Sequence, residues 1–438
     1  MCRFMVAFAA LSVVKFSLVF YMPILLWKGG LAPLDYIDSG RGRIPRLLRV
    51  LAGLFLLALV MMPDTAGAEW SLIPLPVYDT SRNGGGEYGV MPVVLLKEQN
   101  EYIYGIFAPS VIYNGQTGVN LTLRYLGYPT LDKNYRIFVN HAVGVDQEYT
   151  AEYWDHKFMD GKFRLFARAT YFEDSQYRFF GLAETSREED ETNYANCELS
   201  PQFMLGYYLP HNLVLSYGEK LRWVTTRHGR VNRLPYIKDN FSTLDGINGG
   251  GVLDRRLTLT YDTRDDEVFP SSGSFANLYE EIGHSFSHNR VFTKTGLDAR
   301  TYISLDDKRF ITVLKGAIEV TGGRKVPFFE RSTIGGENTL RGFGGYRFTD
   351  DGFILINIEE RIRLFRLHIY GVWSDWELAP FVDVGRVYSS FRKDFLRHYQ
   401  VNPGVGIRAI VQPNVVGRVD LGYGKEGLTA FVGLDFPF

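Results

Sequence analysis

The chain has 438 residues, two cysteines and a formal net charge of −1 at pH 7. The balanced charge gives no basis for binding nucleic acid, and two cysteines cannot build a disulfide framework. Aromatic residues make up 15% of the chain while charged residues still reach 22%. That mixture excludes a polytopic helical membrane protein, but it is compatible with a membrane barrel, whose apolar residues occupy every second position.

Residues 1–68 are predicted to be a leader that contains a signal peptide. Four arginines precede the apolar run "VLAGLFLLALVMM" at 50–62, and the small residues "AGA" follow at 66–68. A charged region, an apolar region and a small-residue cleavage site in this order predict export with cleavage near Ala68. The alternative, a transmembrane helix, is disfavoured because the run is shorter than the roughly twenty apolar residues that span a bilayer. A longer apolar segment at 4–27 comes first, and we interpret it as an over-extended gene start.

Residues 69–85 are predicted to be a periplasmic lead-in. They include most of "IPLPVYDTSRNGGG" at 73–86, which is rich in proline and glycine and typical of a connecting segment. The lead-in is too short for a separate periplasmic domain. We therefore expect the barrel to begin at residue 86 and to continue to residue 438.

Alternation of apolar and polar side chains dominates residues 86–438 and predicts an all-β fold. In 119–128 one face is apolar and the other polar; the apolar residues are Val119, Leu121, Leu123 and Tyr125, and the polar ones are Asn120, Thr122 and Arg124. The predicted strands are about 10 to 16 residues long, which is long for a soluble sheet and suits a tilted crossing of a bilayer. An apolar outer face and a charged inner face are typical of an outer-membrane barrel, whereas a soluble sandwich would have shorter strands.

The strand count rests on a C-terminus in the periplasm. Counting backward from it yields an antiparallel transmembrane barrel of about 16 strands, with 88–98 as one strand too many, and an even total is expected of a bacterial barrel. Whether 88–98 is a wall strand stays open at this point. The same count places the loop at 335–348 and the acidic stretch at 186–192 outside the cell.

Four stretches near the C-terminus carry a family signature. The loop "GGENTLRGFGGYRF" at 335–348 resembles the arginine-glycine-aromatic loop of the BamA and TamA superfamily of outer-membrane assembly and translocation proteins, also called the bacterial surface antigen family. The segment 259–278 is similar to that family's strand-turn-strand motif. The segments 356–364 and 381–388 are similar to its glutamate-x-arginine strand and its phenylalanine-x-aspartate-x-glycine strand.

Strand parity places the acidic residues of this signature in the lumen. Ile356 and Ile358 mark a lipid face, so Glu359 points inward; Val382 and Val384 do the same for the next strand. The inward residues of that second strand are Phe381, Asp383 and Gly385.

The resemblance implies that the loop folds into the barrel and that Arg341 pairs with Asp383 and Glu359. A planar guanidinium can bind a carboxylate through two hydrogen bonds, which lysine cannot do. Gly342 is expected to permit a close backbone approach and a positive φ, and Phe343 to anchor the loop tip. The alternative is an exposed loop arginine above ordinary lumen acids.

The C-terminus "FVGLDFPF" matches the pattern by which outer-membrane barrels are recognised for insertion, through Gly433, Phe436 and Phe438. Alternation predicts one strand from 427 to 438 with both phenylalanines on its apolar face. Pro437 cannot donate a ladder hydrogen bond, which indicates a weak seam between the last strand and the first. In the family that seam is the lateral gate.

Other apparent motifs indicate neither an enzyme nor a metal or cofactor site. "GHSFS" at 283–287 lacks the final glycine of a nucleophile elbow, and the eight histidines show no metal-ligand spacing. "REEDE" at 187–191 is typical of a solvated loop; the alternative is a site for divalent cations that bridge lipopolysaccharide.

Two functions remain open. The resemblance implies a Gram-negative outer-membrane barrel, a short member without periplasmic POTRA domains, that assists insertion or translocation of protein or lipid. The alternative is a passive channel or structural surface-antigen barrel. Expected partners are outer-membrane lipid and lipopolysaccharide, the insertion machinery during biogenesis, and a polypeptide or lipid client. A homodimer through the barrel wall is also compatible with the sequence.

Overall fold

The computed structural model describes residues 69–97, 103–128, 135–369, 372–389, 397–411, 415–434 and 436–438. The predicted signal peptide, the cleavage site near Ala68 and the apolar segment at 4–27 lie outside the described residues. No helix in the described part of the chain is long and apolar enough to cross a membrane.

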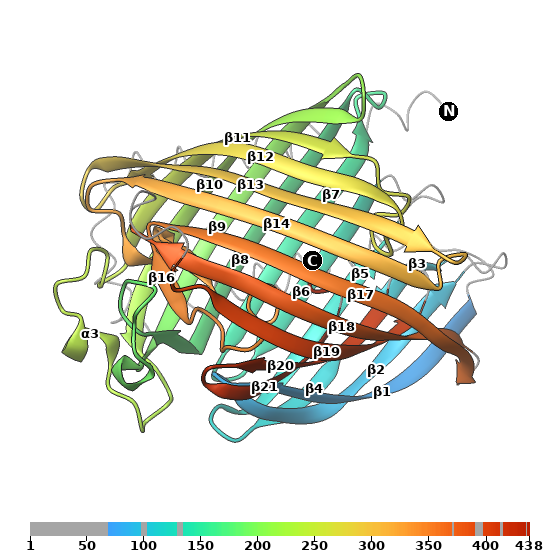
Figure 1. Ribbon diagram of the computed structural model, residues 1–438, viewed down its shortest axis with the longest axis horizontal. Helices are drawn as coiled ribbons and strands as arrows, with labels where there is room; N and C mark the ends of the chain where they lie inside the picture. Colours follow the sequence, from blue (N-terminus) through green and yellow to red (C-terminus); the bar gives the residue numbers. More distant parts are fainter. Residues whose placement is uncertain are drawn as a thin grey trace, which may run out of the picture. The chain divides into compact units, whose positions relative to one another are not determined.

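Within the described residues the wall is one antiparallel sheet of 19 strands that curls round on itself (Figure 1). Strands that follow each other in the chain are neighbours in the sheet, as in a barrel that runs up and down. The strands of the sheet are β1 (Glu69–Ser81), β2 (Gly85–Lys97), β3 (Ile103–Phe107), β4 (Ser110–Asn114), β5 (Gly118–Gly127), β6 (Tyr135–Val143), β7 (Gln147–Phe158), β8 (Phe163–Phe179), β9 (Thr192–Leu209), β10 (Leu213–His228), β11 (Gly250–Asp262), β12 (Gly273–Ser285), β13 (Arg290–Leu305), β14 (Phe310–Gly323), β17 (Gly352–Ile369), β18 (Val372–Tyr388), β19 (Gln400–Val411), β20 (Val415–Gly424) and β21 (Gly427–Leu434).

The remaining elements belong to loops at one end of the barrel. The β14–β17 loop, residues 324–351, carries the turn η3 (Phe328–Glu330) and the hairpin of β15 (Ser332–Ile334) and β16 (Phe348–Asp350). Two other loops carry η2 (Glu188–Asp190) and α3 (Ile237–Asn240). We call this end of the barrel the loop end.

The predicted barrel is confirmed, but its first strands differ from the sequence-based count. The segment 69–85, expected as a lead-in, forms β1, the turn that follows it and the first residue of β2, and β1 pairs along its whole length with β2. Residues 88–98 therefore fall largely in a wall strand. The prolines of β1, Pro74 and Pro76, contribute to the interpretation as a connecting segment, but proline is tolerated where one side of a strand needs no ladder bonds.

One predicted strand is also split. The segment expected as a strand at 101–113 contains β3 and β4, and both of these pair with β2 on one side and β5 on the other. They are two halves of one wall position, separated by Ala108 and Pro109. Proline lacks the N–H that a continuous ladder would use, which accounts for the break.

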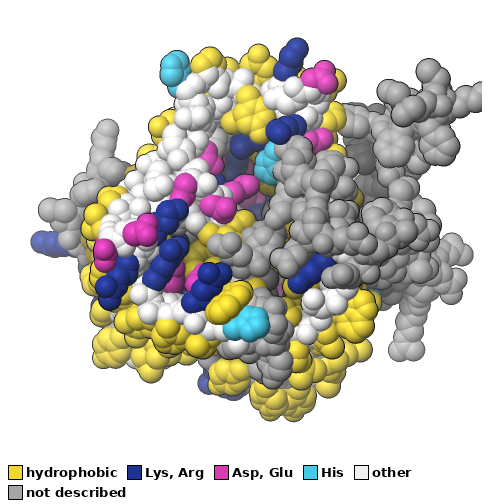
Figure 2. Space-filling view, turned by 90° about the vertical axis from the view of Figure 1, so that its right-hand side faces the viewer, with side chains coloured by type: hydrophobic (Ala, Val, Ile, Leu, Met, Phe, Trp, Pro, Cys, Tyr) yellow, Lys and Arg dark blue, Asp and Glu magenta, His cyan; other side chains and the backbone are white. Residues whose placement is uncertain are grey.

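The wall is inside-out, as the alternation predicted. In β5, Val119 and Leu121 are 54% and 46% exposed while Thr122 is 6% exposed. Figure 2, a view along the barrel, shows charged side chains gathered in the interior and hydrophobic ones around the outside. The exposed apolar band is the surface that lipid covers.

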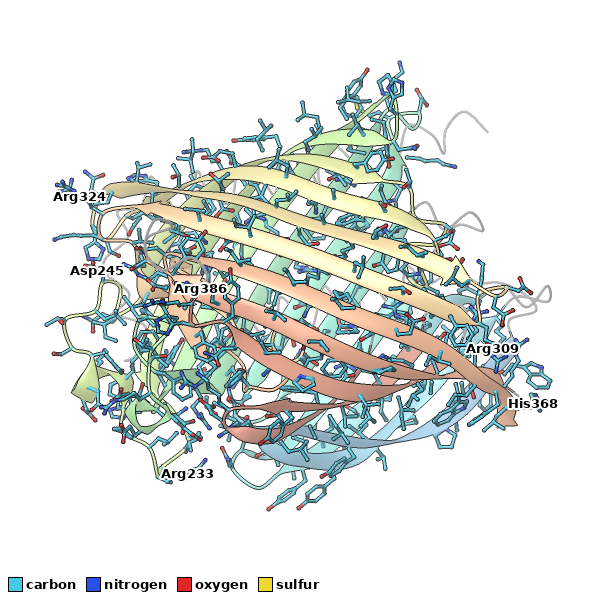
Figure 3. The ribbon with its side chains drawn as sticks, in the orientation of Figure 1. Arg233, Asp245, Arg309, Arg324, His368 and Arg386 are labelled. Atoms are coloured by element: carbon cyan, nitrogen blue, oxygen red, sulfur yellow. The ribbon has the colours of Figure 1, made fainter. Side chains whose placement is uncertain are left out.

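Charged and polar side chains also mark the two ends of the barrel. Arg233, Asp245 and Arg324 lie at the loop end, and Arg309 and His368 lie at the opposite end (Figure 3). Such ends can remain in water while the band between them meets lipid.

The lipid-facing assignment predicts a depth-dependent effect of charge. Leu257 lies midway along β11 and is 51% exposed. Leu257→Lys should lower the free energy of unfolding by about 2–4 kcal/mol in a bilayer, because an ammonium group would be forced into hydrocarbon. Reversible unfolding in lipid vesicles measures the change, and Leu257→Val is the matched control. An equal effect of both substitutions would contradict the assignment.

Candidate functional site

The β14–β17 loop folds back into the lumen and presents Arg341 to the wall. Backbone bonds close its tip, with the N–H of Gly336 donating to the carbonyl of Phe343 over 3.1 Å. The flanks are apolar and fully buried: Leu340 is 0% exposed and Phe343 is 1% exposed. The loop is therefore held by its own turn and by burial on both sides of the arginine.

Arg341 meets the two acids that the resemblance pairs with it. Its Nε and Nη2 donate to the two carboxylate oxygens of Asp383 over 2.9 and 2.8 Å, and its Nη1 donates to Glu359 over 2.7 Å. The backbone N–H of Arg341 also donates to Asp383 Oδ2, the oxygen that Nε contacts, over 3.0 Å. All three side chains are 0% exposed. The guanidinium is thus held in one orientation by charge-assisted bonds.

The other predicted loop and wall residues surround this pair. The Phe381 ring centroid lies 3.3 Å from Arg341 Cζ, an arrangement in which the aromatic face attracts the cation. A Cβ on Gly342 would come within 2.4 Å of the Asn402 amide, so glycine is required for the approach. The expected positive φ is wrong for Gly342 and is found instead at Gly335 and Gly336. Phe343 packs edge-on against Phe348, with centroids 4.9 Å apart.

The aromatic loop tip belongs to a buried apolar cluster that reaches three wall strands, β14, β17 and β18. Its members are Ala317, Ile334, Leu340, Phe343, Phe348, Leu355 and Val387. Gly385 of β18 lies against Leu355 and Ile334, so the inward position predicted for it borders this cluster. The loop is anchored by apolar packing beside its ionic contacts.

Sequence reasoning missed the two strands that complete the ionic network. Arg408 in β19 donates to Glu359 over 3.0 Å and lies 2.8 Å from Asp420 in β20. Arg361 donates to Glu359 over 3.1 Å, and Arg418 donates to Asp420 over 3.1 Å. Strand alternation could have found these residues, because the neighbouring valines and isoleucines of β19 and β20 face lipid.

The network compensates for the cost of burying charge. Burial by itself would lower the pKa of Arg341, but the hydrogen bonds and charge of Asp383, with Glu359, raise it above its usual value. Breaking such a pair would leave an uncompensated buried charge, which costs far more than the intact pair contributes. We call Arg341, Asp383, Glu359, Arg361, Arg408, Asp420 and Arg418 the latch network.

The C-terminal residues differ from the prediction. β21 ends at Leu434, and the last residues turn into the lumen instead of extending the strand to 438. Phe438 is 8% exposed and packs with Tyr302, Ile311 and Val313. The Phe436 ring centroid lies 3.6 Å from Arg361 Cζ. Both phenylalanines are attracted by the cations and apolar residues of the lumen, which local alternation cannot indicate.

Ion pairs join the two sides of the seam at the loop end. β1 and β21 contact each other, and Arg82 in the turn after β1 donates to the backbone carbonyl of Glu426 in the turn before β21, over 2.7 Å. The Glu426 carboxylate accepts a 2.5 Å bond from Arg347 of the β14–β17 loop. Arg82 also pairs with Glu188. We call Arg82, Glu426, Arg347 and Glu188 the seam staple.

A second buried ion group holds the start of the loop. Glu330, 1% exposed, accepts bonds from Arg222 over 2.6 Å and from Lys294 over 2.8 Å. Among the described residues, Glu330 with Asp254 and Glu281 is the one carboxylate group close enough to surround a metal ion. Arg222 and Lys294 already supply positive charge there, so the group serves better as an ion-pair anchor.

Comparison with known proteins identifies the family. A model of the Omp85 superfamily domain matches residues 131–426. The chain belongs to the Omp85 superfamily. This confirms the family resemblance of the loop signature and, with it, location in the outer membrane of a Gram-negative bacterium.

Solved Omp85 structures share the fold. BamA from Haemophilus ducreyi lacking POTRA domains 1–3 matches with a TM-score of 0.51 and 14% identity, over 83% of this chain and 75% of that one. CdiB from Escherichia coli matches with a TM-score of 0.54 and 14% identity, over 82% of this chain and 67% of that one. At such identity these likenesses concern the fold alone.

The latch network predicts that this Omp85 barrel depends on Arg341. Arg341→Ala should lower the free energy of unfolding by about 3–5 kcal/mol, because Asp383 and Glu359 would be left buried without their cation. Arg341→Lys should recover only part of the loss, since lysine cannot bind both oxygens of Asp383 in one plane. Denaturant unfolding and chymotrypsin cleavage at the loop measure the effect. Arg324→Ala, at an exposed position of the same loop, is the control, and equal stability of all variants would refute the latch.

The Glu330 anchor predicts a pH dependence. Burial raises the pKa of Glu330, but Arg222 and Lys294 bring it down to about 2, from an ordinary value of 4.5. Because the folded pKa is depressed, the stabilisation is present above about pH 4.5 and is lost as the pH falls toward 2. As the pH falls from about 4.5 toward 2, the rate of pepsin cleavage of the loop should rise in the native protein. The rise should be less steep in Glu330→Gln. Identical pH profiles would contradict the anchor; Glu189→Gln, in a solvated loop, is the control.

Proposed function

We propose that this chain is a conditional assembly or translocation barrel of the Omp85 superfamily, which assists the insertion or movement of protein or lipid at the seam between β1 and β21. The observation that carries the proposal is the seam staple. Side chains from both seam hairpins and from the β14–β17 loop meet at Glu426. Release of the loop would therefore weaken the seam at its loop end.

The latch and the staple are proposed to form one mechanical unit. Arg341 fixes the loop to β17 and β18, while Arg347, six positions later, binds Glu426 beside the seam. Asn83, also in the first seam turn, donates to the Gly345 carbonyl over 2.8 Å. A loop fixed at Arg341 thus keeps these two contacts with the seam in place, and the seam opens when they separate.

The remaining roles follow from this proposal. Gly433, Phe436 and Phe438 are proposed to act as the insertion signal while the chain is unfolded, before the phenylalanines enter the lumen. Outer-membrane lipid and lipopolysaccharide would surround the wall, the insertion machinery would act during biogenesis, and a polypeptide or lipid would be the client. We propose no enzymatic step and no cofactor, and a homodimer through the wall remains compatible with the proposal.

Weakening the staple tests the function. Partly exposed ion pairs contribute about 1 kcal/mol each, so Arg82→Ala should raise the open fraction of the seam about fivefold. Vesicles that contain the purified protein are assayed for ion conductance and for the rate at which an unfolded client barrel inserts. We expect both to increase in Arg82→Ala and in Glu426→Ala.

The control is Arg187→Ala, because Arg187 is 66% exposed and pairs with Glu189 and Asp190 of its own loop. It should behave as the native protein does. Steady conductance with no faster insertion in any variant would favour the passive channel or structural barrel and overturn the proposal.

A further inference from the structure

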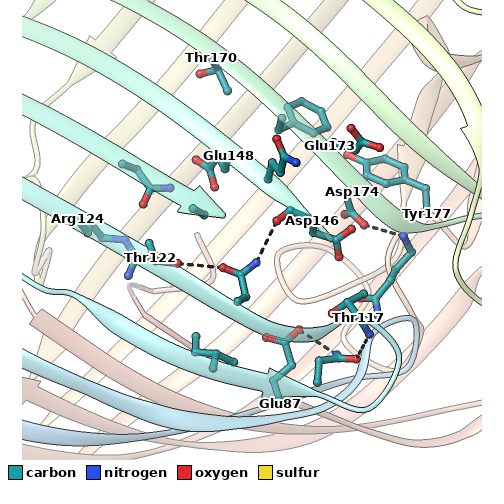
Figure 4. A pocket seen from close by; sticks show the side chains of 18 residues that line it. Glu87, Thr117, Thr122, Arg124, Asp146, Glu148, Thr170, Glu173, Asp174 and Tyr177 are labelled. Atoms are coloured by element: carbon teal, nitrogen blue, oxygen red, sulfur yellow. Dashed lines mark hydrogen bonds between the residues drawn. The ribbon is translucent and has the colours of Figure 1, made fainter. Parts of the chain in front are cut away.

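A polar cavity of about 470 Å³ lies in the lumen against β2 and β4–β8, toward the loop end (Figure 4). Its walls are the inward faces of these strands, including Asn120, Thr122 and Arg124, whose neighbours Val119 and Leu121 face lipid. None of these residues belongs to the latch network or the seam staple. The cavity is therefore a feature of the opposite part of the wall.

The cavity is strongly acidic. Five carboxylates line it and one guanidinium, that of Arg124; the acids are Glu87, Asp146, Glu148, Glu173 and Asp174. Figure 4 shows these side chains around one space. Carboxylates that surround a water-filled space lower its potential and concentrate cations within it.

Most of the acids have neutral partners. Glu87 accepts from the Asn114 amide, Glu148 from the Thr150 hydroxyl, and Asp174 from the backbone N–H of Gln176. Asp146 likewise accepts a backbone N–H. This differs from the Glu330 group, where an arginine and a lysine supply the positive charge.

The one arginine of the cavity, Arg124, interacts with the charge of Glu148, but a single guanidinium cannot balance five carboxylates. Arg124 donates to the sulfur of Met91 over 3.6 Å, a weak contact. Glu173 lies 3.6 Å from Arg227, which is 46% exposed. The acids therefore retain capacity for a cationic ligand.

A second feature of the cavity also indicates a missing donor. Asn140 is 4% exposed and lines the cavity, and its side-chain oxygen has no hydrogen-bond partner within the described part of the chain. A buried amide oxygen without a donor is costly, and such groups mark places where a ligand or water binds. An N–H donor in the cavity would satisfy it.

The spacing of the acids distinguishes between kinds of cation. Among the described residues, the one group of three or more carboxylates close enough to share a metal ion is Asp254, Glu281 and Glu330, and no cavity acid belongs to it. The cavity instead offers separated charges and an apolar wall, where Phe172 and Tyr177 are stacked with centroids 6.5 Å apart. Separated ammonium groups joined by alkyl chains fit both features.

We propose that this cavity binds a linear organic polyamine. Its ammonium groups would each pair with a carboxylate, its methylene segments would lie along the Phe172 side of the wall, and one N–H would reach the Asn140 oxygen. This site shares no residue with the latch network or the seam staple.

Binding would also act on the β14–β17 loop. Tyr177 lines the cavity, and its hydroxyl lies 3.0 Å from that of Tyr346 in the β14–β17 loop, with the two rings stacked 4.7 Å apart. A ligand that orders Tyr177 orders the loop through this contact. Because it binds the folded state, it also raises the melting temperature.

Spermidine is the probe for the test. Calorimetry at low salt on protein purified from outer membranes should show saturable binding, together with a higher melting temperature. Glu148→Gln and Glu87→Gln should each weaken the affinity about tenfold, since each removes one charge-assisted hydrogen bond. Mg²⁺ added at the same total concentration of positive charge should not displace spermidine.

Two further variants protect the test from effects on folding. Asn120→Lys leaves every carboxylate in place but puts an ammonium group into the cavity, and it should weaken binding to the same degree. Glu189→Gln, an exposed acid at the loop end, should bind as the native protein does. Absent or non-saturable binding, displacement by Mg²⁺, or unchanged affinity in Asn120→Lys and Glu148→Gln would each overturn the proposal.

Discussion

A guanidinium group that is removed from water must be surrounded by acceptors, and this requirement organises the C-terminal half of the barrel. Arg341 is 0% exposed and draws carboxylates from β17 and β18, with Asp420 of β20 3.7 Å away. Those carboxylates in turn hold Arg361, Arg408 and Arg418. The loop therefore cannot leave the lumen without separating several buried charges together.

The same loop connects the network to the seam. Arg347 binds Glu426, and the last phenylalanines enter the lumen against Arg361 and beside Arg341. The turns next to the first and last strands, β1 and β21, are thus joined at the loop end by side chains, and the C-terminus is held in the lumen. Side-chain contacts of this kind can separate without unfolding the strands, which is the property a conditional seam requires.

The lumen has two electrostatically different sides. Around Arg341 positive and negative groups are paired and closely packed, so that region is rigid and holds the loop. Along β2 to β8 acids predominate and leave a cavity. Tyr177 and Tyr346 join the two sides, because one lines the cavity and the other belongs to the loop. A ligand bound in the cavity can therefore influence how well the β14–β17 loop is ordered.

The sequence by itself determined the barrel, its lipid-facing band, the family and the Arg341, Asp383 and Glu359 group, because a period of two is a local property and the signature motifs are contiguous. Only the tertiary structure decided that residues 69–81 belong to the wall, that the terminal phenylalanines turn inward, and that Arg408, Arg82 and Glu426 complete the contacts. These depend on which distant strands meet when the sheet curls round. Proline content and local alternation carry no information about such long-range neighbours. The partners of the buried charges lie on strands that come together only in the folded wall.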